Sequence, residues 1–294
     1  MTGGTAIPIE RSRYADFVAL TKPRLNLLVI ATAAAGFYLG SRDGVDYPRF
    51  VNTVVGTALV AGGASALNQL FERRVDGLMR RTRTRPLPGG RVHPVEAGWF
   101  ALLLSVAGLL LLGLGATWMA ALVALVTLVT YVAAYTPLKL RTSFATVVGA
   151  IPGALPPMIG WAGATGGLSR EAWVLFSIVF LWQMPHFLAI AWLFRDDYAR
   201  AGFPMLPVVE PDGRSTARQV MAYTGALLPV SLTPTAIGLA SELYFVGAFV
   251  LGLVFMWLAL GFARRRTDRD ARLLFIGSIT YLPLIWILMI AART

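Results

Sequence analysis

Long apolar segments, separated by short polar stretches, follow one another along most of the chain. A helix needs roughly 20 apolar residues to cross the hydrocarbon core of a bilayer, and these segments approach or reach that length. The pattern therefore predicts an all-α, polytopic membrane protein with nine transmembrane helices. We place the helices at residues 25–40, 51–67, 95–115, 118–135, 145–164, 172–193, 220–239, 243–262 and 273–292.

The polar stretches between these segments are too short to form a separate soluble domain, the longest being residues 72–94 and 195–218. We therefore expect residues 1–294 to form a single integral-membrane domain. Residues 1–22 are polar and lack the features of a cleavable signal peptide, so we expect them to be a cytoplasmic N-terminal segment.

The basic residues predict the orientation of the helices in the membrane. With the N-terminus in the cytoplasm, 22 of the 26 Lys and Arg residues fall on the cytoplasmic side. Cytoplasmic loops of membrane proteins carry an excess of Lys and Arg, so this split favours a cytoplasmic N-terminus and an outside C-terminus. The four basic residues left outside are Arg42, Arg49, Arg170 and Arg293.

Composition supports this class of protein and excludes others. The chain is 56% hydrophobic and 14% charged, as expected for an integral membrane protein. Its net charge of +11 follows from the cytoplasmic arginines and does not require a nucleic-acid partner. With no cysteine in the chain, disulfides, thiolate catalysis and cysteine-ligated metals are excluded.

The segment that continues the second apolar helix carries the strongest chemical signal. Asn68, Glu72 and Asp76 recur every four residues, so on a helix they share one face. Oxygen ligands in this arrangement suit Mg²⁺, which uses one or two carboxylates together with water and substrate phosphate. Arg81 and Arg85 follow closely and could bind phosphate oxygens. Arginines that only fix the membrane topology would not explain the acids at helical spacing.

A second acidic segment follows the sixth apolar helix, at Asp196 and Asp197. Four helices separate it from the first, which suggests two similar four-helix halves that face one another. Two carboxylate clusters at one end of a bundle are expected to share a substrate, such as a diphosphate held by bridging Mg²⁺ ions. Ordinary solvated acids, paired with nearby arginines, are the alternative interpretation.

Three further residues stand out by type and position. His186 lies within an apolar helix, where ionisable groups usually face a cavity or a partner. Neutral imidazole is also a common iron ligand, although a structural histidine is the alternative. Lys139 and Arg141 lie at the same end as the acids, and they are either substrate-binding cations or simple topology anchors.

Motifs spread over nearly the whole chain resemble those of the protoheme IX farnesyltransferase branch of the UbiA-type intramembrane prenyltransferase superfamily. The matching motifs are Leu20-Thr21-Lys22-Pro23-Arg24, then Asn68-x₃-Glu72-x₃-Asp76-x₂-Met79-x-Arg81-Thr82-x₂-Arg85-Pro86, then Tyr135-Thr136 with Lys139 and Arg141, then Gly153-Ala154-x-Pro156-Pro157, then Trp182-Gln183-x-Pro185-His186-Phe187 and Asp197-Tyr198-x₃-Gly202-x-Pro204.

The resemblance implies a fold in which the helices surround a central cavity, and it implies a reaction. A farnesyl group would pass from farnesyl diphosphate to the 2-vinyl group of protoheme IX, with addition of water, giving heme O and diphosphate. It also implies an inner-membrane location, Mg²⁺ as cofactor, heme as substrate, and a downstream heme-modifying membrane enzyme as a partner. Another acceptor (an aromatic acid, quinone precursor or chlorophyllide) and a non-enzymatic transporter are the alternative functions.

The resemblance also assigns roles to residues. Asn68, Glu72, Asp76 and Asp197 would be the catalytic residues, and Asp196 would join them as metal ligands. The remaining candidates would bind the diphosphate, the heme propionates or the heme itself, and these are Arg81, Arg85, Lys139, Arg141, His186 and Tyr198.

Overall fold

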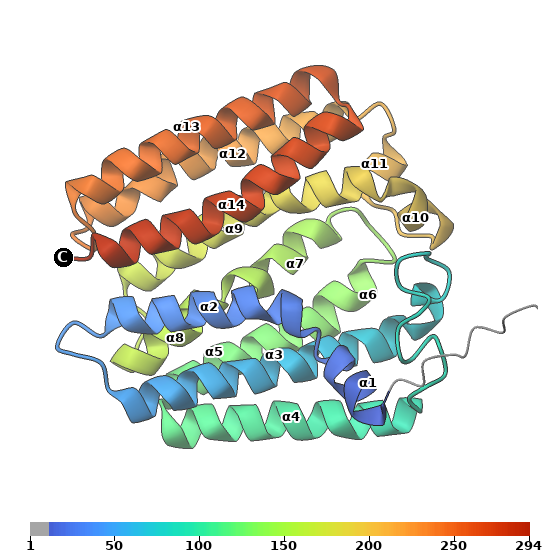
Figure 1. Ribbon diagram of the computed structural model, residues 1–294, viewed down its shortest axis with the longest axis horizontal. Coiled ribbons are helices and arrows are strands. Elements are labelled where there is room, and N and C mark those ends of the chain that lie inside the picture. The colour runs from blue at the N-terminus through green and yellow to red at the C-terminus, as the bar shows by residue number, and fades with distance from the viewer. Residues whose placement is uncertain (1–11) are drawn as a thin grey trace, which may run out of the picture.

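The computed structural model describes residues 12–294, and it is a bundle of helices (Figure 1). The helices of the described residues are α1 Arg13–Leu20, α2 Pro23–Gly40, α3 Tyr47–Asp76, α4 Pro94–Gly115, α5 Trp118–Val129, the π-helix η1 Thr130–Tyr135, α6 Thr136–Leu138, α7 Ala145–Ala154, α8 Pro156–Thr165, α9 Arg170–Leu193, α10 Arg195–Arg200, α11 Leu206–Val209, α12 Arg214–Ala236, α13 Glu242–Arg265 and α14 Asp268–Ala291.

Two groups of long helices form the bundle. In the first group, α3 packs against α4 and α2 packs against α8, while α5 contacts α4 and α8. In the second group, α9, α12, α13 and α14 pack against one another. Figure 1 shows the groups on opposite sides, and they meet where α7 and α8 contact α9 and where α2 contacts α14. The sequence predicted two similar four-helix halves, and the second group does hold four long helices, whereas the first holds α2, α3, α4, α5 and the broken span α7–α8.

The predicted number of spans is not confirmed. Each of the nine apolar segments is helical, but seven helices of the described residues are long and apolar enough to cross a membrane. The bent pair of α1 and α2 would add an eighth. The helix left out is α12, which carries serine and threonine residues as well as Pro229 and Pro234 inside the helix. These polar residues lower its mean hydropathy, so the apolar residues of this segment predicted a span that the composition of the whole helix does not support. The chain is nonetheless a multi-pass membrane protein.

The helices are interrupted or change their pitch at three places. α1 and α2 meet at an angle of 48°, with Lys22 between them at a positive φ of 48°. Leu155 separates α7 from α8, directly before Pro156. The fourth predicted span ends in the π-helix η1, and π-helices occur frequently at functional sites.

Glycines allow α2 and α8 to approach backbone to backbone. A Cβ atom on Gly36 would lie 2.2 Å from the carbonyl oxygen of Pro157. A Cβ on Gly160 would lie 1.8 Å from the carbonyl oxygen of Ala33. Small residues permit such close contacts between membrane helices, and here they fix the broken span α7–α8 against α2.

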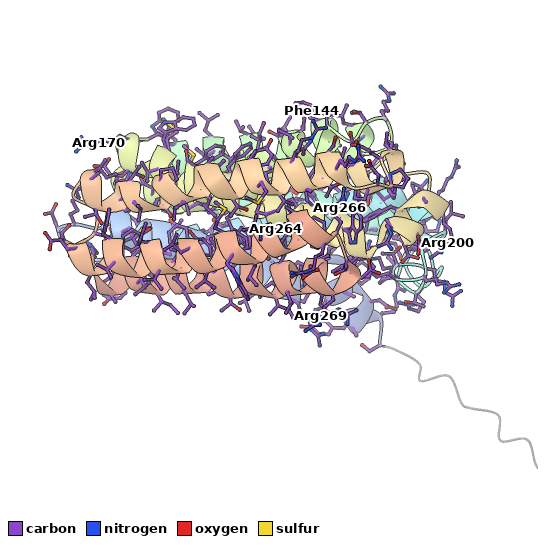
Figure 2. All side chains as sticks on the ribbon, turned by 90° about the horizontal axis from the view of Figure 1, so that it is seen from above. Phe144, Arg170, Arg200, Arg264, Arg266 and Arg269 are labelled. Atoms are coloured by element: carbon purple, nitrogen blue, oxygen red, sulfur yellow. The ribbon has the colours of Figure 1, made fainter. Side chains whose placement is uncertain are left out.

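One end of the bundle, which we call the basic end, is formed by residues 77–93, residues 139–144 and α10–α11. Figure 1 shows these segments together on the right, whereas the C-terminus and the connections α2–α3 and α8–α9 lie at the opposite end. Figure 2 shows Arg200, Arg266 and Arg269 towards the basic end and Arg170 at the opposite end. The basic residues therefore separate between the two ends as the sequence predicts.

Candidate active site

The C-terminal part of α3 brings three of the predicted residues into the interior at the basic end. Because α3 is 30 residues long, it continues beyond the apolar part of its span. Asn68, Glu72 and Asp76 are all buried, with 3%, 3% and 0% of their surfaces exposed. The predicted common helix face is therefore turned into the protein, where uncompensated carboxylates would be costly.

Each of these three side chains is paired with a basic residue from another segment. Lys22 Nζ donates to Asn68 Oδ1 at 3.0 Å. Lys139 Nζ lies 3.1 Å and 3.3 Å from the two carboxylate oxygens of Glu72. Arg85 Nη1 donates to Asp76 Oδ2 at 2.8 Å. We call these three pairs the motif ion pairs, although Asn68 is a neutral partner.

One carboxylate oxygen in this cluster has no partner. Asp76 Oδ1 is buried and makes no hydrogen bond, which is unusual for a carboxylate oxygen in a protein interior. A bound cation would satisfy it, and the neighbouring oxygens of Glu72 and Asn68 are the donor types that Mg²⁺ prefers. The residues present therefore fit a magnesium ion. Within residues 12–294, no three Asp, Glu or His side chains converge closely enough to hold a metal by themselves.

Lys139 is held among aromatic rings as well as by Glu72. Its Nζ lies 4.6 Å from the ring centre of Phe203 and 5.9 Å from that of Tyr135. Burial alone would lower the pKa of Lys139, but the neighbouring Tyr135 and Glu72 side chains outweigh that effect, and the pKa lies above its ordinary value. Lys139 is therefore a permanent cation at this site.

Arg81 and Arg141 occupy less central positions. Arg81 is exposed and stacks its guanidinium on the ring of Phe194, at 5.2 Å. Arg141 is exposed at the basic end, and no ion pair of its side chain is present among the described residues. Of the four cations predicted to bind substrate, Arg85 and Lys139 thus contact the acidic residues directly.

The second acidic segment forms the short helix α10 at the basic end. Asp197 is paired with Arg200 in the same helix, and Asp196 is exposed. Tyr198 is buried in a cluster with Met79 and Phe203, so the segment that follows α3 packs directly against the one that follows α9. The described structure brings the two segments together through these apolar side chains, and it does not gather their carboxylates into one cluster.

A cavity of about 380 Å³ extends from the lysine side of the motif ion pairs into the bundle. Lys22, Lys139 and Tyr198 line it together with Tyr131 and Tyr135 of the π-helix. Its remaining wall is mostly apolar and comes from α2, α3, α5, α7, α8, α9 and α14. Gly149 makes room for the Tyr135 ring, because a Cβ there would lie 2.6 Å from two of its ring carbons.

His186 lines the same cavity. Its Nδ1 lies 2.7 Å from Ser278 Oγ, and its ring stacks on the rings of Trp182 and Phe275, with each ring centre 5.1 Å away. These contacts fix the orientation of the imidazole. Sequence reasoning identified His186 but missed Ser278, which follows no motif and lies on the last helix.

Sequence reasoning also missed the role of Lys22. The residue belongs to the first matching motif and was counted only among the topology residues, yet it contacts Asn68 and lines the cavity. Its adjacency to Pro23 at the start of a helix was the available signal. Of the two π-helix tyrosines, Tyr135 belongs to a matching motif, whereas Tyr131 gave no signal. The π-helix itself was not predicted, since a local change in helix pitch leaves no mark in an apolar segment.

Comparison with known proteins agrees with this description. A model described as the UbiA prenyltransferase family matches residues 29–286. A protein of Solibacter usitatus (strain Ellin6076) named protoheme IX farnesyltransferase is 48% identical, over 95% of this chain and 98% of its own. A protein of the same name from Koribacter versatilis (strain Ellin345) is 42% identical, over 98% of this chain and 96% of its own.

Solved structures share the fold. A structure from work on digeranylgeranylglyceryl phosphate synthase in membranes matches with a TM-score of 0.80 at 14% identity, covering 95% of this chain and 98% of the other. A UbiA homolog from Archaeoglobus fulgidus bound to GPP and Mg²⁺ matches with a TM-score of 0.70 at 14% identity, covering 93% and 99%. The chain therefore belongs to the UbiA prenyltransferase family and is a membrane-bound prenyltransferase.

Proposed function

We propose that the protein transfers the farnesyl group of farnesyl diphosphate to the 2-vinyl group of protoheme IX, with addition of water, to give heme O and diphosphate. The observation that carries the proposal is the cavity that joins the motif ion pairs to His186. The names of the relatives, at 48% and 42% identity over nearly the whole chain, support the choice of substrates.

The motif end of the cavity suits the diphosphate. Asn68, Glu72 and Asp76 would hold a Mg²⁺ ion, and Asp197 with Asp196 would help to hold a second. Bound there, magnesium supplies positive charge that stabilises the leaving diphosphate. Arg85 and Lys139 lie beside this position, and together with Arg81 and Arg141 they would bind phosphate oxygens or heme propionates. Guanidinium groups suit this role because they bind such oxygens in pairs.

The apolar part of the cavity suits the farnesyl chain and the reaction that follows. Breaking the allylic C–O bond leaves positive charge on the prenyl carbon, and bulk water would capture it. Val29, Val179 and Ile190 line the cavity and keep this region apolar. The rings of Tyr131 and Tyr135 line it near Lys139, and the faces of aromatic rings attract cationic groups.

The acceptor would lie at the His186 end. In the bond changes, a carbon of the vinyl group bonds to the prenyl carbon, the oxygen of a water molecule bonds to the other vinyl carbon, and a proton is lost. His186 would contact the heme, either as a ligand to its iron or as a polar group beside the vinyl. Its stacking contacts with Trp182 and Phe275 support a positioning role of this kind.

The direct test is mass spectrometry of heme after incubation of purified protein with farnesyl diphosphate, Mg²⁺ and protoheme IX. We expect a product with the mass of heme O. A parallel reaction with 4-hydroxybenzoate as acceptor should give no prenylated product. Unmodified protoheme from well-folded protein would contradict the proposal, and a prenylated aromatic acid would replace it with the alternative acceptor.

The distribution of charge supports an orientation with the basic end in the cytoplasm, and the family resemblance supports a location in the inner membrane. In that orientation the N-terminus is cytoplasmic and the C-terminus lies outside. A downstream membrane enzyme that modifies heme O would then receive the product within the same bilayer.

A further inference from the structure

The motif ion pairs occupy most of the positions that a metal ion would need. Lys22 donates to Asn68 Oδ1, and Lys139 contacts both carboxylate oxygens of Glu72. Asp76 offers its unpartnered Oδ1, while Arg85 contacts only Oδ2. A divalent ion that binds through all three side chains would lie against the ammonium groups of both lysines, which its charge repels, whereas Arg85 contacts the other oxygen of Asp76 and can stay where it is.

The lysines come from elements other than α3, so their displacement does not disturb the helix that carries the ligands. Lys22 lies at the junction of α1 and α2, and Lys139 directly follows α6. Both line the cavity. Each has a long, flexible side chain, whose ammonium group can turn from a protein oxygen to a phosphate oxygen on a bound substrate without movement of the backbone.

The charges at the site decide which ligands can bind. Two carboxylates, Glu72 and Asp76, are matched by two cations, Arg85 and Lys139, and Lys22 adds a third basic group, so this buried group has no excess of negative charge. A divalent ion bound alone would leave an excess of at least two positive charges, which is unfavourable away from water. With Lys22 protonated, a divalent ion bound together with a trianionic prenyl diphosphate would bring the group to neutrality.

We propose that Lys22 and Lys139 are exchangeable counter-ions, which bind the metal-ligand oxygens of Asn68 and Glu72 until a diphosphate arrives and then transfer to its phosphate oxygens. The divalent metal consequently binds tightly only together with a diphosphate. This inference rests on the proposed function, because it takes the motif ion pairs as the site of the diphosphate.

The test measures metal binding and requires no turnover. Mn²⁺ replaces Mg²⁺, and free Mn²⁺ is measured by its electron paramagnetic resonance signal in a titration of purified protein without acceptor. We expect weak binding of Mn²⁺ alone and tighter binding in saturating farnesyl diphosphate, by a factor within the usual range for coupled sites, roughly 5–150. By reciprocity, Mn²⁺ should tighten farnesyl diphosphate by the same factor.

The discriminating variant is Lys22→Met. Its partner Asn68 is neutral, so removing the ammonium group leaves no unpaired buried charge, and folding should be preserved. We expect Mn²⁺ alone to bind about fivefold or more tightly than to the unaltered protein, and the coupling factor to fall. The matched control is Arg83→Met, which removes the same charge from an exposed residue of the basic end and should leave both quantities nearly unchanged.

The outcomes separate the two proposals. Tight Mn²⁺ binding without farnesyl diphosphate, or equal effects of Lys22→Met and Arg83→Met, would overturn the exchange of counter-ions. If farnesyl diphosphate does not bind at all, the proposed function fails. Inorganic pyrophosphate then replaces it in the same titration, and a coupling that Lys22→Met weakens would still support the exchange, whereas its absence would refute it.

Discussion

At the scale of single residues, Asp76 combines full burial with an oxygen that has no partner. We predict that Asp76→Asn, which preserves the shape of the side chain, lowers turnover by roughly 10²–10³-fold, the usual cost of losing one electrostatic contact to a transition state. Turnover is measured at saturating Mg²⁺ and farnesyl diphosphate. Removal of divalent metal with EDTA should abolish activity in the unaltered protein, and Mg²⁺ should restore it.

The control for this prediction is Asp43→Asn, which makes the same change at an exposed residue at the opposite end of the bundle. It should leave turnover unchanged. An Asp76→Asn protein with the turnover of the unaltered enzyme would show that the first acidic motif does not hold the metal.

His186 offers a second test at this scale, because heme iron reports its ligands in the Soret band. We predict that His186→Ala shifts the Soret band of bound protoheme and sharply reduces product formation, while farnesyl diphosphate still binds. The control is His93→Ala, the only other histidine of the chain, which caps α4 by accepting from the backbone N–H of Val95. An unshifted band with full activity would make His186 a structural residue.

At the scale of helices, the contact between α2 and α8 leaves no room for a side chain at Gly160. We predict that Gly160→Ala lowers the free energy of unfolding by about 1–3 kcal/mol, as overpacking of an interior usually does. The measurement is the thermal unfolding midpoint in detergent, followed by loss of the monodisperse peak in size-exclusion chromatography.

A matched substitution separates overpacking from the general effect of replacing a helical glycine. A Cβ on Gly225 would meet only Met256 Cε, at 3.8 Å. Gly225→Ala should therefore leave stability unchanged or raise it, by up to about 1 kcal/mol. If both substitutions lower the midpoint equally, the close contact of α2 with α8 is not what limits stability.

The helices themselves were largely predictable, because a bilayer requires long apolar segments and each such segment proved helical. Their irregularities were not. Nothing in the run from Trp118 to Tyr135 marks the change to a π-helix at Thr130, and α12 was counted as a span although its mean hydropathy falls below that of the others. The pitch of a helix and the helices that it packs against depend on its neighbours in the fold. The sequence of a single segment does not contain that information.

At the scale of the whole molecule, the separation of basic residues predicts which end faces the cytoplasm. The natural absence of cysteine makes this testable with single introduced thiols. We predict that an impermeant maleimide applied to intact spheroplasts labels Asp43→Cys and leaves Thr84→Cys unlabelled. Both positions are exposed in the structure, and Thr84→Cys should become reactive once the membrane is permeabilised. The reverse pattern would invert the proposed orientation.

Residues from widely separated parts of the chain form the site. Because of this separation, local sequence patterns predict only part of the site. The spacing of Asn68, Glu72 and Asp76 predicted their shared helix face, which their common burial agrees with. Their partners Lys22 and Lys139 lie 46 and 67 positions away along the chain, beyond the reach of any local pattern. The resemblance to a known family identified the motifs, whereas the pairing of their residues is seen only in the structure.

The backbone contact between α2 and α8 also has a consequence for biogenesis. α2 is among the first helices to leave the ribosome, yet its glycine-lined partner follows only after α3, α4 and α5 have been synthesised. Until then the surface of α2 around Gly36 has no neighbour of matching shape, and it must be shielded by lipid or by the insertion machinery. α2 is therefore synthesised early and gains its closely fitting partner late.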